Sequence, residues 1–145
     1  MQKPVVEVDT TISASGDKVW KAMTAHNSAM FPGTQVETDW KIGHPITFTG
    51  EWQGKPFIDK GEIQTFKEGE ELSFTHWSAG SGEAQRPEDY HIVRCRLEPE
   101  GDKTKVTLSQ INMGKKTDID ETTRAEFKKN WQMMLDGLKQ AAESD

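Results

Sequence analysis

The sequence has 145 residues, 18 of them basic and 24 acidic, which gives a formal net charge of −6. This acidic balance, without a basic run, argues against nucleic-acid binding, and the single cysteine, Cys95, excludes an intrachain disulfide. No apolar segment has the length of a signal peptide or a membrane span. We therefore expect a single cytoplasmic domain over residues 1–145 that inserts into no membrane.

The first elements are expected to be a strand and a short helix. Apolar and polar residues alternate over 6–12, as in a half-buried strand. Ser15 then has the chemistry of a helix N-cap. The helix after Ser15 would turn Val19, Trp20 and Met23 toward the core, because their spacing places them on one face.

A second short helical piece is expected over 25–31, because Pro32 and Gly33 would end it. From Gln35 to Ile111 the pattern is that of strands throughout. Residues of one parity form apolar sets, with Thr, Glu, Lys or Arg between them, which predicts six or seven antiparallel strands. These sets are Ile46, Phe48 and Trp52; Leu72, Phe74 and His76; Val93, Cys95 and Leu97; and Val106, Leu108 and Gln110.

Short breaks of turn-forming residues separate the expected strands. They fall at 41–43, 53–55, 68–70 and 100–103, and connections of this length join neighbouring antiparallel strands. The polar stretch 78–89 is longer, and we expect a surface loop there.

The last element has the clearest helical pattern of the chain. One continuous apolar stripe can bury itself only against the concave face of the sheet. Thr123 followed by Glu126 fits a capping box for the start of the helix, with Asp118 and Glu121 as an earlier alternative. The stripe consists of Phe127, Trp131, Met134, Leu135, Leu138, Ala141 and Ala142.

This order of elements resembles the START-like (SRPBCC) superfamily, and within it the branch named for the activator of Hsp-ninety ATPase homologues. The entry from strand to helix, Val8–Thr24, and the hairpin Lys60–Phe74 are similar to that branch. The turn Asp39–Ile46 matches in part, because His44 replaces the second of two usual glycines. In the closing helix, Asn130–Lys139, Asn130 stands where a glycine usually precedes the tryptophan.

The resemblance implies an α+β helix-grip fold, in which a curved antiparallel sheet surrounds the long C-terminal helix, with two short helices after the first strand. It also implies an apolar cavity between sheet and helix. We therefore expect ligand-binding residues on the facing surfaces. They are Trp20, Met23, Trp40, Phe48, Trp52, Phe74, His76, His91, Val93, Cys95, Leu108, Gln110, Trp131, Met134, Leu135 and Leu138.

Two features of this set have alternative interpretations. His76, His91 and Gln110 are polar residues on an apolar face, where they would orient a ligand or exchange protons with it. Alternatively, His76 lies at the mouth of the cavity or is satisfied by a neighbour in an ordinary core. The large side chains of the last helix, Trp131 among them, would form either a cavity wall or a solid core.

Other kinds of site have little support in the sequence. The four histidines and Cys95 lack metal-ligand spacing, so we expect no metal and no cofactor. Cys95 lies within an expected strand, where a buried cysteine acts mostly as a small hydrophobe. No nucleophile elbow or phosphate-binding glycine loop is present.

Three functions follow from the resemblance, because this fold hosts carriers, enzymes and interaction modules. We favour binding of a small hydrophobic or amphipathic ligand, without catalysis. The first alternative is an aromatase/cyclase-type enzyme in which His76 or His91 transfers a proton. The second is a co-chaperone-like module, but no surface pattern supports a chaperone partner, and co-chaperone members carry an additional amino-terminal domain.

Overall fold

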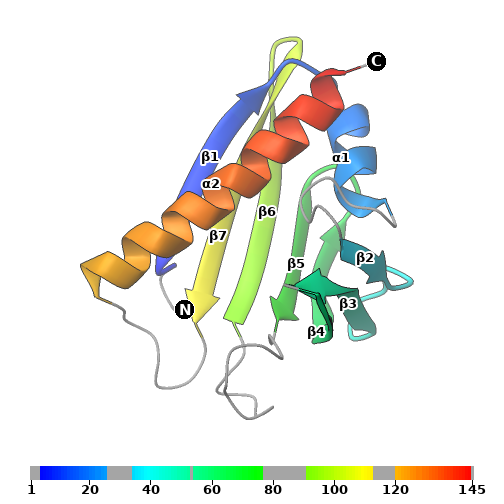
Figure 1. The fold of residues 1–145 in the computed structure, drawn as a ribbon. Helices are drawn as coiled ribbons and strands as arrows, with labels where there is room; N and C mark the ends of the chain where they lie inside the picture. The colour runs from blue at the N-terminus through cyan, green and yellow to red at the C-terminus, as the bar shows by residue number, and fades with distance from the viewer. Residues whose placement is uncertain (1–3, 26–33, 53, 77–90, 113–119, 145) are drawn as a thin grey trace.

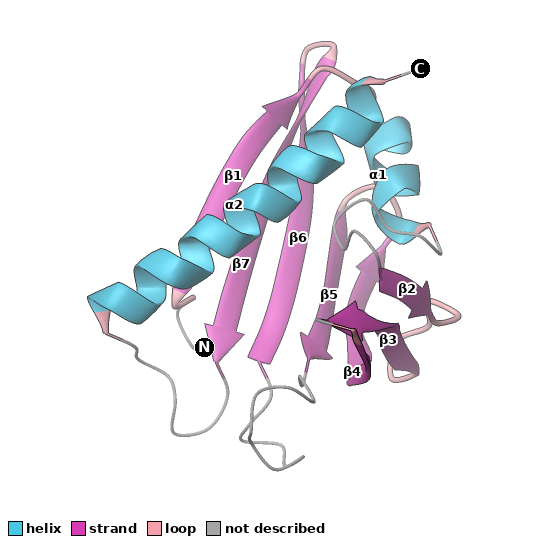
Figure 2. Ribbon diagram, viewed as in Figure 1, coloured by secondary structure: helices cyan, strands magenta, loops and turns pink. Residues whose placement is uncertain are grey.

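The computed structural model describes residues 4–25, 34–52, 54–76, 91–112 and 120–144. In these residues a curved antiparallel sheet packs against two helices (Figures 1 and 2), which confirms the predicted helix-grip fold. The strands are β1 (Val6–Ile12), β2 (Thr34–Glu37), β3 (Pro45–Trp52), β4 (Lys55–Lys67), β5 (Glu71–His76), β6 (His91–Glu100) and β7 (Lys103–Asn112). The helices are α1 (Gly16–Thr24) and α2 (Glu121–Glu143).

Six of the strands form a meander, and the first strand is added at its far edge. The order across the sheet is β1-β7-β6-β5-β4-β3-β2, with all neighbours antiparallel. The tight turns fall where the sequence predicts them. Gly69 and Gly101, for example, have φ of +79° and +64°, the left-handed backbone that glycine adopts without steric cost.

The concave face carries the apolar sets predicted from strand parity. Ile46, Phe48, Leu72, Phe74, Val93, Cys95, Leu97, Val106 and Leu108 are all buried. The outer face is more covered than predicted around β6, because Ser73 and Ser109 are buried on either side of Arg94.

Strand β4 bends and so pairs with different neighbours along its length. Residues 55–62 pair with β3, whereas Ile63–Lys67 pairs with β5, and a register shift lies between Ile63 and Thr65. At Gly61, β4 and β5 approach so closely that a Cβ atom on this residue would lie 1.7 Å from the carbonyl oxygen of Thr75. The Glu62 amide donates a hydrogen bond of 2.9 Å to the Thr75 hydroxyl. Only glycine permits this approach.

The first helix begins as predicted. Ser15 is its N-cap, with the side-chain oxygen accepting a hydrogen bond from the Lys18 amide, and Val19, Trp20 and Met23 are buried. The helical piece expected over 25–31 falls, apart from Ala25, outside the described residues, as do the loop 78–89 and Gln53.

The start of α2 was predicted wrongly. Asp120 is the N-cap, and its carboxylate accepts a hydrogen bond of 2.7 Å from the Thr123 amide. Thr123 and Glu126 therefore lie inside the helix, and Glu121 is its first residue rather than the third. A Thr-x-x-Glu pattern also occurs within helices, so another N-cap nearby can replace it. In the part of the chain that is described, no helix is long and apolar enough to cross a membrane.

Helix α2 crosses the concave face diagonally (Figure 1). Its side chains form hydrogen bonds with the backbone of β1 and of the residues that flank it. Arg124 Nε donates to the Val5 carbonyl at 2.9 Å, and Lys139 Nζ donates to the Thr11 carbonyl at 2.7 Å. The Glu143 carboxylate accepts from the Ser13 amide at 2.8 Å. These contacts satisfy backbone groups that an edge strand would otherwise expose.

We predict that Gly61→Ala destabilises the fold by about 1–3 kcal/mol or more, because the new methyl group overlaps backbone atoms that cannot rotate away. Chemical denaturation followed by tryptophan fluorescence measures this change. The matched control is Gly16→Ala at the start of α1, where the nearest atom, Thr104 Oγ1, is 4.0 Å away. Equal stability of the two variants would show that β4 tolerates a shift at this point.

Candidate functional site

Figure 1 shows the end of the sheet at which β5 finishes and β6 begins. Toward this end the residues of the concave face become polar. Successive cross-strand rows are Leu72, Cys95 and Leu108; then Phe74, Val93 and Gln110; then His76 and His91. We call this region the polar end and define it by His76, His91, Gln110 and Asp59. It corresponds to the part of the predicted site that contains both histidines.

Asp59, His76 and His91 form a hydrogen-bonded series, which we call the histidine chain. His76 Nε2 lies 3.2 Å from Asp59 Oδ2, and His76 Nδ1 lies 3.2 Å from His91 Nε2. The side chains of His76 and Asp59 are 17% and 13% exposed. Phe48 packs edge-on against the His76 ring, with centroids 5.3 Å apart, and also contacts Phe74. The histidine chain is thus partly exposed to solvent and packs on one side against Phe48.

The sequence placed the two histidines together, but Asp59 was not predicted. Its position follows from β4, in which Phe57, Asp59 and Ile63 share a parity and are less exposed than the residues between them. A carboxylate on the inward parity of a strand needs a partner. That requirement was the signal available in the sequence. The close approach at Gly61 brings this part of β4 to the end of β5, where His76 lies.

The geometry of the histidine chain differs from that of a metal site. His76 uses both ring nitrogens, one toward Asp59 and the other toward His91. Metal ligands must instead direct their donor atoms to one common point. Among the residues that the structure describes, no three His, Cys, Asp or Glu side chains are arranged to hold a metal ion.

Burial controls the protonation of two groups on the concave face. Desolvation lowers the pKa of His91 to about 3; the charge of His76 acts in the same direction and that of Asp59 opposes it. His91 is therefore neutral at physiological pH. Burial also raises the pKa of the Cys95 thiol to about 12, so Cys95 is a packing residue rather than a nucleophile.

Gln110 is paired with the C-terminal helix. Its side-chain Oε1 accepts a hydrogen bond of 2.7 Å from Trp131 Nε1, and both side chains are buried. A buried indole N–H left without an acceptor would cost about 1–3 kcal/mol. This contact fixes the distance between α2 and the sheet beside the histidine chain.

The remaining predicted site residues divide into two groups. Val93, Cys95, Leu108, Leu135 and Leu138 have 0% exposure, so no space of the size of a water molecule adjoins them. In this middle part of the interface these side chains are packed as core residues. Met134 is partly buried against it.

A separate aromatic group lies beside α1. Phe66 contacts Trp20 at 5.5 Å and Trp40 at 5.8 Å between ring centroids, and Met23 is buried in the same core. Trp40 adopts a φ of +60°, which is uncommon for a bulky residue. The side chain of Trp52 lies outside the described part of the structure.

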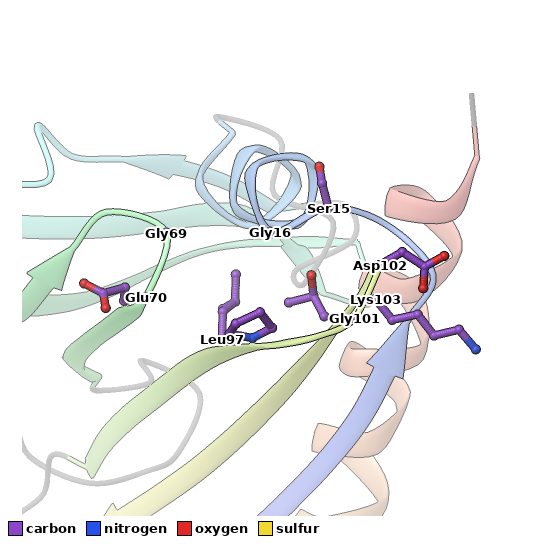
Figure 3. A pocket seen from close by; sticks show the side chains of 10 residues that line it. Ser15, Gly16, Gly69, Glu70, Leu97, Gly101, Asp102 and Lys103 are labelled. Carbon is purple, nitrogen blue, oxygen red and sulfur yellow. The ribbon is translucent and has the colours of Figure 1, made fainter.

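A pocket of about 470 Å³ lies near the turns at the other end of the sheet (Figure 3). Figure 3 shows Leu97 pointing into it, between the start of α1 and the turns that join β4 to β5 and β6 to β7. None of the predicted ligand-binding residues lines it. Its lining is formed by Ser15, Gly16, Gly69, Glu70, Leu97, Pro99, Gly101, Asp102, Lys103 and Thr104.

The neutral state of His91 predicts a specific loss of stability in acid. Below its ordinary pKa of about 6.5, the unfolded chain binds a proton that the folded chain does not, down to about pH 3. The contribution of His91 to the free energy of unfolding is therefore complete above pH 6.5 and decreases as the pH is lowered. Between pH 7.5 and 4.5 we expect wild type to lose about 2–3 kcal/mol more than His91→Gln, measured by urea unfolding.

The control for this comparison is His44→Gln. His44 is half exposed and contacts Asp39 at 2.6 Å on a turn, so its replacement should leave the acid response close to that of wild type. Parallel stability curves for wild type and His91→Gln would contradict the assignment of a neutral, desolvated His91.

Comparison with known proteins places this chain in a family. Residues 13–143 match the family model described as Activator of Hsp90 ATPase homolog 1-like protein. The solution structure of ChR145 from Cytophaga hutchinsonii is 35% identical, with a TM-score of 0.77, over 97% of this chain and 94% of that one. A search of curated proteins gave no match.

Two more distant structures share the fold. Ara h 8.0201 is 16% identical with a TM-score of 0.72, over 96% of this chain and 97% of that one. The Aha1 dimer from Colwellia psychrerythraea is 18% identical with a TM-score of 0.70, over 95% of each chain. Because the family model spans most of the sequence, the resemblance inferred from the sequence is confirmed: the chain belongs to the family of Activator of Hsp90 ATPase homolog 1-like proteins.

Proposed function

We propose that this protein binds a small hydrophobic or amphipathic ligand at the polar end of the concave face, between the sheet and α2. The histidine chain carries the proposal, because it places partly exposed polar groups beside Phe48 and Phe74 on an otherwise apolar surface. An apolar wall with a few convergent polar groups is the usual composition of a small-molecule site. The family resemblance implies ligands of the same class.

Burial supports the polar end over the middle of the interface as the place of binding. The side chains in the middle are 0% exposed, so a ligand there would have to displace close-packed core. At the polar end, Asp59 and His76 retain some exposure while Trp131 and Gln110 hold the helix in place. A ligand at this end would cover side chains that already contact solvent.

The proposal is tested by titrating the full chain with saturated primary alcohols of 8–16 carbons and with two-ring aromatic compounds. Thermal unfolding is the first measurement, because a ligand at a hundred times its Kd stabilises the folded state by about 2.7 kcal/mol. We expect at least one class to raise the melting temperature. His76→Gln should weaken that binding about tenfold, because it removes the central group of the histidine chain.

The chain itself provides a matched control, since Asp39 and His44 form a second carboxylate–imidazole pair on an exposed turn. His44→Gln should leave binding unchanged. If no compound stabilises the protein, or if both glutamine variants weaken binding equally, then the polar end is not the ligand site.

One observation favours the aromatase/cyclase alternative as a second candidate. A carboxylate hydrogen-bonded to an imidazole, which is itself hydrogen-bonded to a second imidazole, is an arrangement through which a proton can move to or from a bound substrate. In that case His91→Gln should lower the turnover of a linear poly-β-carbonyl substrate about 10²–10⁴-fold while its Kd changes little. Cyclisation followed by absorbance, with binding measured separately by calorimetry, distinguishes this outcome. Equal losses of binding and turnover would favour the binding role alone.

A further inference from the structure

The histidine chain fixes the positions of its own protons, starting from Asp59. A carboxylate oxygen only accepts hydrogen bonds, so the contact of 3.2 Å between Asp59 Oδ2 and His76 Nε2 requires a proton on that nitrogen. In a neutral imidazole the other nitrogen is then bare. His76 Nδ1 is therefore a hydrogen-bond acceptor whenever His76 is neutral.

The second contact transfers this constraint to His91. His76 Nδ1 and His91 Nε2 are 3.2 Å apart, and an accepting Nδ1 requires that His91 Nε2 donates. Burial keeps His91 neutral, so its single ring proton is the one on Nε2. His91 Nδ1 is consequently bare. Within the described residues, Nδ1 of His91 makes no hydrogen bond.

We infer that the polar end selects a ligand with an apolar body and a hydrogen-bond donor, such as a hydroxyl group, which donates to His91 Nδ1. This inference rests on the proposed function and specifies the class of its ligand. His91 would touch the ligand, whereas His76 and Asp59 are positioning residues that set the tautomer of His91. A neutral acceptor beside an aromatic wall disfavours ligands that offer only acceptors, because two acceptors would then face each other without a proton between them.

The experiment compares two probes that share an apolar body, 2-naphthylmethanol and its methyl ether, by calorimetry at about pH 9, above the ordinary pKa of histidine. The alcohol can donate a hydrogen bond and the ether cannot. We expect wild type to bind the alcohol about tenfold more tightly than the ether. In Asp59→Asn the ratio should approach one. An amide both donates and accepts hydrogen bonds, so it no longer fixes which ring nitrogen of His76, and hence of His91, carries the proton.

Asp39→Asn is the control, since it changes the exposed carboxylate–imidazole pair in the same way and should leave the tenfold ratio intact. Long-range ¹H–¹⁵N NMR of histidine-labelled protein without ligand provides a second readout. It should place the His91 proton on Nε2 in wild type and distribute it over both nitrogens in Asp59→Asn. A merely structural role of Asp59 would not move this proton.

The outcomes separate the inference from the function on which it rests. Equal affinities of wild type for the alcohol and the ether would overturn the inference and leave a ligand site in place. A His91 proton on Nδ1 would overturn it as well. If neither these probes nor the long-chain alcohols bind, the proposed function fails and the inference fails with it.

Discussion

The close contact between Gly61 and the carbonyl of Thr75 is the constraint on which the curvature of the sheet depends. A side chain at this position would overlap backbone atoms, and the bend of β4 could not form as it does. Because β4 bends here, one strand pairs first with β3 and then with β5. The sheet therefore folds around α2 rather than extending past it. The same bend carries Asp59 to His76, so that curvature and site chemistry have one origin.

The polar side chains of the polar end are paired with one another or with α2, apart from Nδ1 of His91, while the face around them remains apolar. A charged imidazole within this face would lose hydration without a full replacement. His91 avoids that loss by remaining neutral, and His76 shares its two nitrogens between a carboxylate and a second ring. Gln110 and Trp131 likewise satisfy each other's buried polar groups, through the hydrogen bond between the sheet and the helix. The arrangement gives a small number of polar groups with fixed directions, which is what recognition of an amphipathic molecule requires.

Much of the fold could be predicted because local patterns and tertiary structure agree. The alternation over β1, the Ser15 cap and the strand faces around Val93 and Leu108 all depend on residues close in sequence. The pairing of Asp59 with His76 could not be predicted in this way. The register shift between Ile63 and Thr65 changes the parity of β4, so the two ends of that strand cannot be placed from one pattern. Whether the stripe of α2 forms core or cavity depends on packed volume, which sequence spacing does not contain.

The fastening of β1 by α2 has a consequence for how the chain folds. Arg124, Lys139 and Glu143 bind backbone atoms of Val5, Thr11 and Ser13, more than a hundred residues earlier in the sequence. Among the strands that the structure describes, β1 pairs only with β7. During synthesis on the ribosome, strands β2 to β6 can therefore assemble before the first strand has a neighbour. β1 joins the sheet only after β7 has emerged, and its edge is covered only after α2. Contacts of such long sequence separation make folding slow, and the uncovered edge is the stage at which nascent chains are most exposed to association with one another.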